Sequence, residues 1–344
     1  MSIKLTRRAV MATAIAAPAL LRTSWALAAT ELRVMAWQGY ADDDWVKEFQ
    51  ETAGITPKVV FIGTDDEIWA KIKGSEGKDF DLFAVNTAQL QRYIDAGLVT
   101  PYDLDKVPNQ KETLPRFRDL SKVSGVMRDG KVYAIPFAFD SIGLIYDTDK
   151  VKPAPDSMEI LWDPKYKGKV LAYDNGEHNF SFTALTMGID TPFNLTPDQM
   201  AKVKDRLIEF KHNILTFYSQ PDEALKIYES NDVALVWGNF GHQQIKQFKD
   251  AGHDVGYVIP KEGALAWLDT WVLSSKVKDK DLAEAWVNFV LQKKISQALT
   301  ERQGFGNTVT ELPGDNPNDK LIWLLPVEDY TKRSDLWNEI KATP

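Results

Sequence analysis

The sequence contains no cysteine. A disulfide framework, a thiolate nucleophile and a cysteine-ligated metal are therefore excluded. It has only four histidines, and none of them stands in the HExxH or HxH spacing of a metal site. It also lacks a GxSxG elbow, a Walker loop and a GxGxxG fingerprint. Nothing in the sequence requires catalysis, and we expect neither a metal nor a cofactor.

Long apolar runs are also absent, except near the N-terminus. There Lys4, Arg7 and Arg8 precede the run AVMATAIAAPALL, which is too short and too rich in alanine to span a bilayer well. The Ala-Leu-Ala sequence that ends at Ala28 fits a signal peptidase site, so residues 1–28 are expected to be a cleaved signal peptide. The pair Arg7-Arg8 is typical of a twin-arginine export signal; a Sec signal that holds two arginines is the alternative.

Basic side chains are in the minority: 41 Lys and Arg stand against 49 Asp and Glu, a net charge of −8. Residues 1–28 hold four of the cations and no acid, so the remainder carries −12. An acidic surface argues against nucleic acid as a partner and mildly favours cationic partners. The acidic runs Asp42–Asp44 and Asp65-Asp66 are interpreted as solvated helix caps. Roughly 316 residues after the leader suit two domains rather than one.

The mature chain opens with strands and helices in alternation, which predicts a parallel sheet with crossover helices. The predicted strands are 31–37, 56–63 and 79–86, and the predicted helices are 42–54, 65–77 and 87–99. In the second half, the apolar segment 133–147 has no helical period and is interpreted as strands passing between domains. Further strands are expected at 232–239 and 264–274, helices at 197–212 and 279–304, and short helices in the tail after residue 312.

Residues 264–273 read ALAWLDTWVL and set a carboxylate between two tryptophans. In an extended strand, side chains two residues apart share a face, so Trp267, Asp269 and Trp271 are expected to point the same way. Two interpretations compete: an accident of core packing, and a site shaped for an organic cation.

Other aromatic residues stand where predicted strands end. Trp37 and Tyr40 lie at the end of strand 31–37, and Trp237 lies near the end of its own strand. Open α/β sheets bind ligands at the carboxyl ends of their strands. Indole faces attract alkylammonium groups, and each such contact contributes about 0.5–2 kcal/mol as water leaves. Asp269 would neutralise the cation, because a buried carboxylate without a partner is unfavourable or becomes protonated.

A further indication comes from the segments AWQGYADDDWVKEFQETAGI, DFDLFAVN, PFAFDSIGLIYDTDKV, ILWDPKYKGKV and YVIPKEGALAWLDTWVL. In these segments the chain resembles the periplasmic spermidine/putrescine-binding proteins of ABC importers. The resemblance covers nearly all of the mature chain. It implies a type II periplasmic binding protein with two mixed α/β lobes, which are joined by crossover strands and close around the ligand. The lobes are expected at 31–139 plus 269–308 and at 140–268 plus 309–344.

The resemblance also implies a function. We expect a monomeric solute-binding protein in the periplasm that has no catalytic activity. It would bind a polyamine or a related organic amine and present it to a membrane permease. One alternative within this class is a receptor for an amino acid, betaine or opine-like zwitterion. An exported enzyme is the alternative from another class.

The family's stacking aromatic residues fall on Trp37, Tyr40, Trp237 and Trp267, and a family carboxylate falls on Asp269. Trp271 matches no ligand residue of the family and is assigned to packing.

Several positions depart from the family. Two acids of polyamine-binding members align with Asn175 and His178, although Asp174 and Glu177 stand one residue away and a shifted alignment could restore them. An aromatic position is Ala88, after Asn86 and Thr87, and a tyrosine position is Phe305. Asp140 replaces a small residue and has either a ligand role or a hinge hydrogen bond. The expected ligand-binding set is Trp37, Tyr40, Asn86, Thr87, Asp140, Asn175, His178, Trp237, Trp267, Asp269 and Phe305.

Overall fold

The structure, a computed structural model, describes residues 31–312, 316 and 318–343. The predicted signal peptide, with its twin-arginine pair and its cleavage site, lies outside the described residues. Within these ranges no helix combines the length and the hydropathy needed to cross a membrane.

The described chain alternates strands with helices. The strands are β1 (Arg33–Trp37), β2 (Lys58–Ile62), β3 (Leu82–Asn86), β4 (Val99–Thr100), β5 (Met127–Arg128), β6 (Lys131–Val132), β7 (Ala134–Asp147), β8 (Val170–Tyr173), β9 (Ile214–Tyr218), β10 (Leu235–Gly238), β11 (Val255–Val258), β12 (Ala264–Ser274), β13 (Gly306–Asn307) and β14 (Leu321–Trp323). The α-helices are α1 (Asp43–Ala53), α2 (Asp65–Gly74), α3 (Thr87–Asp95), α4 (Pro115–Arg118), α5 (Gly176–Thr186), α6 (Pro197–Lys211), α7 (Pro221–Ser230), α8 (Gly241–Asp250), α9 (Lys280–Val290), α10 (Lys293–Gln303) and α11 (Tyr330–Ala342).

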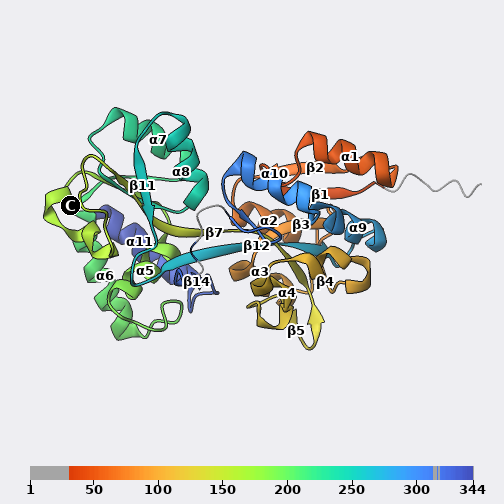
Figure 1. The fold of residues 1–344 in the computed structure, drawn as a ribbon. Coiled ribbons are helices and arrows are strands. Elements are labelled where there is room, and N and C mark those ends of the chain that lie inside the picture. Colours follow the sequence, from red (N-terminus) through yellow and green to blue (C-terminus); the bar gives the residue numbers. More distant parts are fainter. Residues whose placement is uncertain (1–30, 313–315, 317, 344) are drawn as a thin grey trace, which may run out of the picture. The chain divides into compact units, whose positions relative to one another are not determined.

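The main sheet has the strand order β2-β1-β3-β12-β7-β10-β8-β9. We call β2, β1 and β3 the β1 side, and β10, β8 and β9 the β8 side. Strands within each side are parallel, as the alternation of strands and helices predicts. Helices α1, α2, α3, α9 and α10 surround the β1 side, and α5 to α8 and α11 surround the β8 side (Figure 1).

Two long antiparallel strands, β7 and β12, connect the sides. The C-terminal part of β12 pairs with β3, where Asp269 stands opposite Asn86. Along most of its length β12 also pairs with β7, and a register shift falls between Asp269 and Thr270. The C-terminal part of β7 pairs with β10, where Leu144 stands opposite Trp237. The segment predicted as strands passing between domains is therefore one strand of 14 residues.

Buried apolar side chains form one large cluster on the β1 side and two smaller ones on the β8 side. The first takes its members from 32–139 and 268–305, and the other two draw theirs mainly from 142–265 and 324–340. Contacts group residues 31–344 into one compact unit, so the lobe boundaries given by the sequence stay predictions.

The single helix expected at 279–304 is instead two helices, α9 and α10. Gln292 between them is extended, with φ −64° and ψ 140°. Neither glycine nor proline marks this break, so the sequence carries no local signal for it. The tail also differs, because α11 has 13 residues and buries Trp337 and Ile340 in a β8-side cluster.

Candidate functional site

Asp269 lies in the middle of β12 and is only 7% exposed. The hydroxyl of Tyr40 donates a hydrogen bond of 2.8 Å to its Oδ2, and the Nδ2 of Asn86 donates one of 3.3 Å to its Oδ1. Tyr40 follows β1 and Asn86 ends β3, so the carboxyl ends of two parallel strands bring these donors to β12. Both donors are neutral, and no lysine or arginine of the described chain forms an ion pair with Asp269.

Burial raises the pKa of Asp269 to about 7, and the negative charge of Asp65 acts in the same direction. The hydrogen bonds from Tyr40 and Asn86 lower this pKa, but they do not offset the loss of water. Burial, together with the charge of Asp269, holds the pKa of Tyr40 well above its usual value, so Tyr40 remains a proton donor. The centre of the site is a buried acid that lacks a positive partner.

Aromatic rings extend from this acid toward the β8 side. The rings of Tyr40 and Phe305 are 5.8 Å apart, and those of Phe305 and Trp267 are 5.6 Å apart, both edge to face. The indole N–H of Trp267 donates to the carbonyl oxygen of Asn239, just after β10, at 3.3 Å. The structure thus places five expected residues in one contiguous group: Asp269, Tyr40, Asn86, Phe305 and Trp267.

Trp37 and Thr87 are close in sequence to two members of this group, Tyr40 and Asn86. Trp37 ends β1 and is half-buried, and its indole N–H is buried without a hydrogen-bond partner in the described part of the chain. Thr87 begins α3 and is buried. Trp271, assigned to packing, lies in the core with its ring 5.7 Å from that of Phe137.

Trp237 is placed differently from the expectation. Its side chain is 0% exposed and belongs to a β8-side core cluster. The ring of Phe182 lies 4.2 Å from its own ring. Phe182 therefore occupies space next to the indole that a ligand was expected to use, and a ligand role for Trp237 stays a prediction.

Asp140 is also engaged within the protein. Its Oδ2 accepts the backbone N–H of His242 at 2.8 Å, and its Oδ1 accepts the backbone N–H of Ser141 at 2.7 Å. The Nδ1 of His242 lies 2.8 Å from Oδ1. These bonds hold the first turn of α8 against β7. Of the two interpretations given above, the geometry therefore favours a structural hydrogen bond near the crossover strands.

Asn175 and His178 stand at the two positions that were aligned with acids of polyamine-binding proteins. The Oδ1 of Asn175 accepts the backbone N–H of His178 at 2.8 Å and caps α5. Burial lowers the pKa of His178 to about 4, so its ring is neutral at neutral pH. Its Nδ1 lies 2.9 Å from Oδ1 of Asn239, the residue that also binds Trp267. Neither residue supplies an anion.

Two acids outside the expected set have raised pKa values: Glu177 is buried and Asp65 is half-buried. Glu177, in the first turn of α5, is 6% exposed, and its carboxylate has no hydrogen bond or ion pair within the described ranges. Burial and then the charge of Asp65 raise its pKa to about 7. Asp65 begins α2; its Oδ1 is buried without a partner among the described residues, and burial raises its pKa to about 6.

Asp65 lies in the first turn of α2, as expected, but one of its two carboxylate oxygens is out of contact with water. Of the two acids that a shifted alignment offered, Glu177 has no partner for its carboxylate among the described residues, whereas the carboxylate of Asp174 binds other side chains of the protein. Oδ1 of Asp174 lies 2.8 Å from Nζ of Lys341 and accepts the indole N–H of Trp337 at 2.7 Å.

The sequence profile of the bacterial extracellular solute-binding proteins matches residues 44–320. The chain belongs to this family. The putrescine-binding periplasmic protein PotF of Escherichia coli is 26% identical over 346 residues, which cover 90% of this chain and 91% of that protein. The spermidine/putrescine-binding periplasmic protein 1 of Haemophilus influenzae is 25% identical over 310 residues, covering 88% and 83%.

A solved structure supports the fold of this solute-binding protein. The spermidine/putrescine ABC transporter substrate-binding protein PotD from Streptococcus pneumoniae superposes with a TM-score of 0.76 at 22% identity, over 91% of this chain and 98% of that one. The family resemblance and the fold class stated from the sequence are therefore confirmed.

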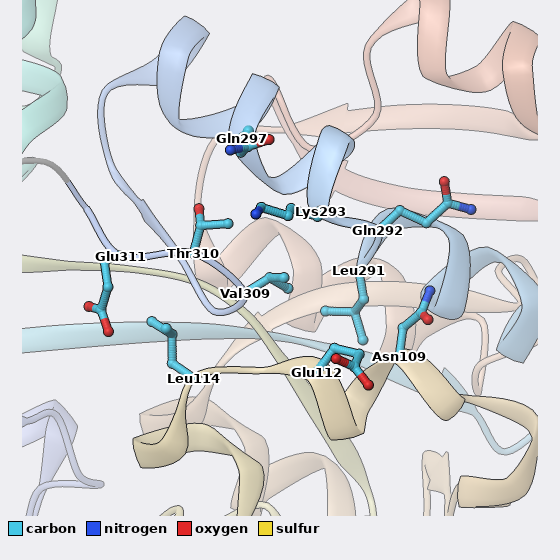
Figure 2. Close-up of a pocket in the computed structure, with 10 residues that line it drawn as sticks. All are labelled: Asn109, Glu112, Leu114, Leu291, Gln292, Lys293, Gln297, Val309, Thr310 and Glu311. Atoms are coloured by element: carbon cyan, nitrogen blue, oxygen red, sulfur yellow. The ribbon is translucent and has the colours of Figure 1, made fainter.

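This solute-binding protein also has a hollow of about 620 Å³ on the β1 side, away from Asp269 (Figure 2). Lys293 and Gln297 of α10 face Val309 and Thr310 across it (Figure 2). Its volume suits a small ligand. However, its lining includes no aromatic ring and no residue of the expected set. The full lining is Asn109, Glu112, Leu114, Leu291, Gln292, Lys293, Gln297, Val309, Thr310 and Glu311.

Proposed function

We propose that this protein is the periplasmic receptor of an ABC importer and that it binds a linear polyamine, such as putrescine or spermidine, beside Asp269. The observation that carries the proposal is the buried carboxylate of Asp269, whose hydrogen-bond partners, Tyr40 and Asn86, are both neutral. A buried anion of this kind is stabilised by a cation that enters with the ligand. The names of the two curated relatives, a putrescine-binding and a spermidine/putrescine-binding protein, support the same ligand class.

The aromatic rings account for the rest of such a ligand. An ammonium group next to Asp269 would place its methylene chain against Trp267 and Phe305. Indole and phenyl faces cover methylene groups and attract the positive charge at the same time. As water leaves, the attraction between the ammonium and the ionised carboxylate strengthens, because the surroundings screen it less.

The remaining parts of the proposal follow from the class of protein. The relatives are named as periplasmic binding proteins, and the predicted signal peptide would export this chain to the same compartment. We propose that a membrane permease receives the ligand from the closed form, that the protein acts as a monomer, and that it carries out no reaction of its own.

A zwitterionic ligand is less well matched to the charges. Its carboxylate would need a cation, and His178 is neutral while Asn175 is occupied as a helix cap. Arg92 is the arginine beside Asp65, and its guanidinium stacks on Trp69 at 4.7 Å and donates to the main-chain oxygen of Asp65 at 3.1 Å. Around Asp269 and Asp65, acidic side chains outnumber basic ones. This balance of charge favours a polyamine over an amino acid, betaine or opine.

The test is titration calorimetry with protein that has been unfolded, dialysed and refolded to remove any bound amine. Putrescine, spermidine, 4-aminobutyrate and a quaternary amine are titrated in turn. We expect putrescine or spermidine to bind most tightly. Absence of binding by all four compounds would refute the proposal. Preference for 4-aminobutyrate would instead identify a receptor for zwitterions.

A further inference from the structure

We propose that the C-terminal helix α11 positions Trp267, the residue against which the methylene chain of the ligand would lie, by holding the first turn of α5 in place. This inference rests on the proposed function. It assigns a role in ligand binding to Arg333, Trp337 and Lys341 of α11, which are outside the ligand-binding set expected from the sequence.

Helix α11 packs directly on the start of α5. It lies beside α5 and α6 on the β8 side (Figure 1). A Cβ added to Gly176, the first residue of α5, would lie 2.8 Å from Cβ of Trp337 and 2.9 Å from the main-chain oxygen of Arg333. Gly176 does not have a positive φ, so lack of space rather than backbone conformation requires glycine here. A displacement of α11 would therefore also displace the first turn of α5.

Arg333 joins the two helices through a side chain that is 0% exposed. Its Nη1 donates to the main-chain oxygen of Glu177 at 3.2 Å and to Oγ of Ser181 at 2.7 Å. Its Nη2 donates to the main-chain oxygen of Pro192 at 2.8 Å. Nε and Nη2 also donate to the carboxylate of Glu328, at 2.9 and 2.7 Å. Because the planar guanidinium uses all its N–H donors, it fixes the position of α5 relative to α11.

The segment just before α5 is attached to the same helix. Oδ1 of Asp174 accepts the indole N–H of Trp337 at 2.7 Å and lies 2.8 Å from Nζ of Lys341. The side chains of Lys341 and Asp174 are 28% and 30% exposed, so their ion pair is partly shielded from water. The loop from β8 into α5 and the first turn of α5 therefore share one support.

The first turn of α5 is connected to Trp267 by two hydrogen bonds. Nδ1 of His178, in this turn, lies 2.9 Å from Oδ1 of Asn239. The main-chain oxygen of Asn239 accepts the indole N–H of Trp267 at 3.3 Å, and this bond attaches the ring to the β8 side. Arg333 and Trp337 are 0% and 3% exposed, so a ligand does not contact them. They act on the ligand through the first turn of α5 and Asn239.

Two variants disturb this support without removing a buried side chain. Gly176→Ala forces the first turn of α5 away from α11, and Lys341→Met removes the ion pair with Asp174. We expect each to weaken the binding of putrescine about two- to tenfold in calorimetry at pH 8. Lys204→Met is the matched control for Lys341→Met. Lys204 is similarly exposed and pairs with Glu339 of α11 at 2.6 Å, but it lies on α6, so its replacement should leave the affinity unchanged.

A double-mutant cycle separates positioning from a general loss of stability. Gly176→Ala and Lys341→Met are each combined with Trp267→Ala. If α11 acts through Trp267, the loss of affinity caused by either variant should largely disappear when the indole ring is absent. The same factor of loss in both backgrounds, no loss in either, or an equal loss in Lys204→Met would overturn the inference. If Gly176→Ala does not fold, Lys341→Met completes the cycle, because its side chain is partly exposed.

The wild type separates this inference from the proposed function. If the wild type binds neither putrescine nor spermidine, the proposed function fails and the role of α11 fails with it. If it binds putrescine but the cycle shows no coupling to Trp267, the site at Asp269 stands and only the role of α11 is refuted.

Discussion

Replacing Asp269 with asparagine should stabilise the empty protein while weakening its binding of putrescine. The pKa of Asp269 is raised from 3.8 to about 7 in the folded protein. Between about pH 4 and pH 7 the folded state therefore holds a proton that the unfolded state has lost, so stability falls as the pH rises through this window. A shift of roughly three pKa units corresponds to a destabilisation of the folded protein by about 4 kcal/mol. This penalty applies in full above pH 7 and is absent below about pH 4.

Asparagine carries no charge and avoids this penalty. It has nearly the same shape as aspartate and keeps an acceptor for the hydroxyl of Tyr40. Asp269→Asn should therefore have a higher free energy of unfolding than the wild type at pH 8, by up to about 4 kcal/mol, and nearly the same value at pH 4. Urea denaturation at the two pH values measures this difference.

Binding should change in the opposite direction. Removing one partner of a buried, hydrogen-bonded charge pair weakens association by about 2–5 kcal/mol, or roughly 30-fold to several thousand-fold in the dissociation constant for putrescine. Asp140→Asn is the contrasting variant. Asp140 accepts N–H groups of Ser141 and His242, so its replacement should lower stability by about 1–3 kcal/mol. Wild-type affinity in Asp269→Asn, or lower stability at pH 8, would refute the reasoning about Asp269.

Three further outcomes are expected. The affinity for putrescine should fall as the pH is lowered from 8 to 5, because Asp269, with a pKa of about 7, takes up a proton that competes with the ammonium group. Calorimetry at a series of pH values checks this, and a constant affinity would contradict it. Trp267→Ala should weaken the binding of putrescine and of n-butylamine by a similar factor, about 2- to 30-fold, because the indole ring would contact the four-carbon chain that both amines share. Unequal factors, measured by calorimetry, would argue against this placement. Gly304→Ala should lower both the melting temperature and the affinity for putrescine. Gly304 has φ +92°, and an added Cβ would lie 2.9 Å from Cα of Gln243 at the start of α8. Thermal melts and calorimetry on the same preparation test this prediction, and an unchanged melting temperature would contradict it.

Much of the fold could be predicted because its signals are local. The period of the apolar residues gave β12 with its observed limits and placed the first three strands and helices within a few residues. The break between α9 and α10 could not be predicted in this way. Gln292 is extended there although no glycine or proline is nearby, so packing of the two helices on different neighbours decides the break rather than local propensity.

The candidate site was partly predictable. Asp269 stood out because aromatic residues flank it, and Tyr40 because it follows a strand end. Trp237 has the same local sequence signal as Tyr40, yet it lies in a core beside Phe182. Whether an aromatic residue at a strand end faces a ligand or the core depends on which segments pack against it, and these come from distant parts of the chain.

Two acids in similar sequence positions show the difference most clearly. Asp44 and Asp65 both occupy the first turn of a helix that follows a strand. Asp44 is 59% exposed and lies 2.7 Å from Nη2 of Arg302, whereas Asp65 has a buried oxygen without a partner among the described residues. No local pattern separates them, because burial and pairing are set by residues that are distant in the sequence.

The sequence by itself determined the family, the α/β alternation and the strand ends at which a ligand can bind, since these depend on short-range periodicity and on motifs. Only the tertiary structure decided which carboxylates lose water without gaining a cation. Asp269 lies where β12 pairs with β3, and burial raises its pKa to about 7. Desolvation is a property of the whole packed environment, and it raises the pKa of Asp269 well above that of an ordinary aspartate.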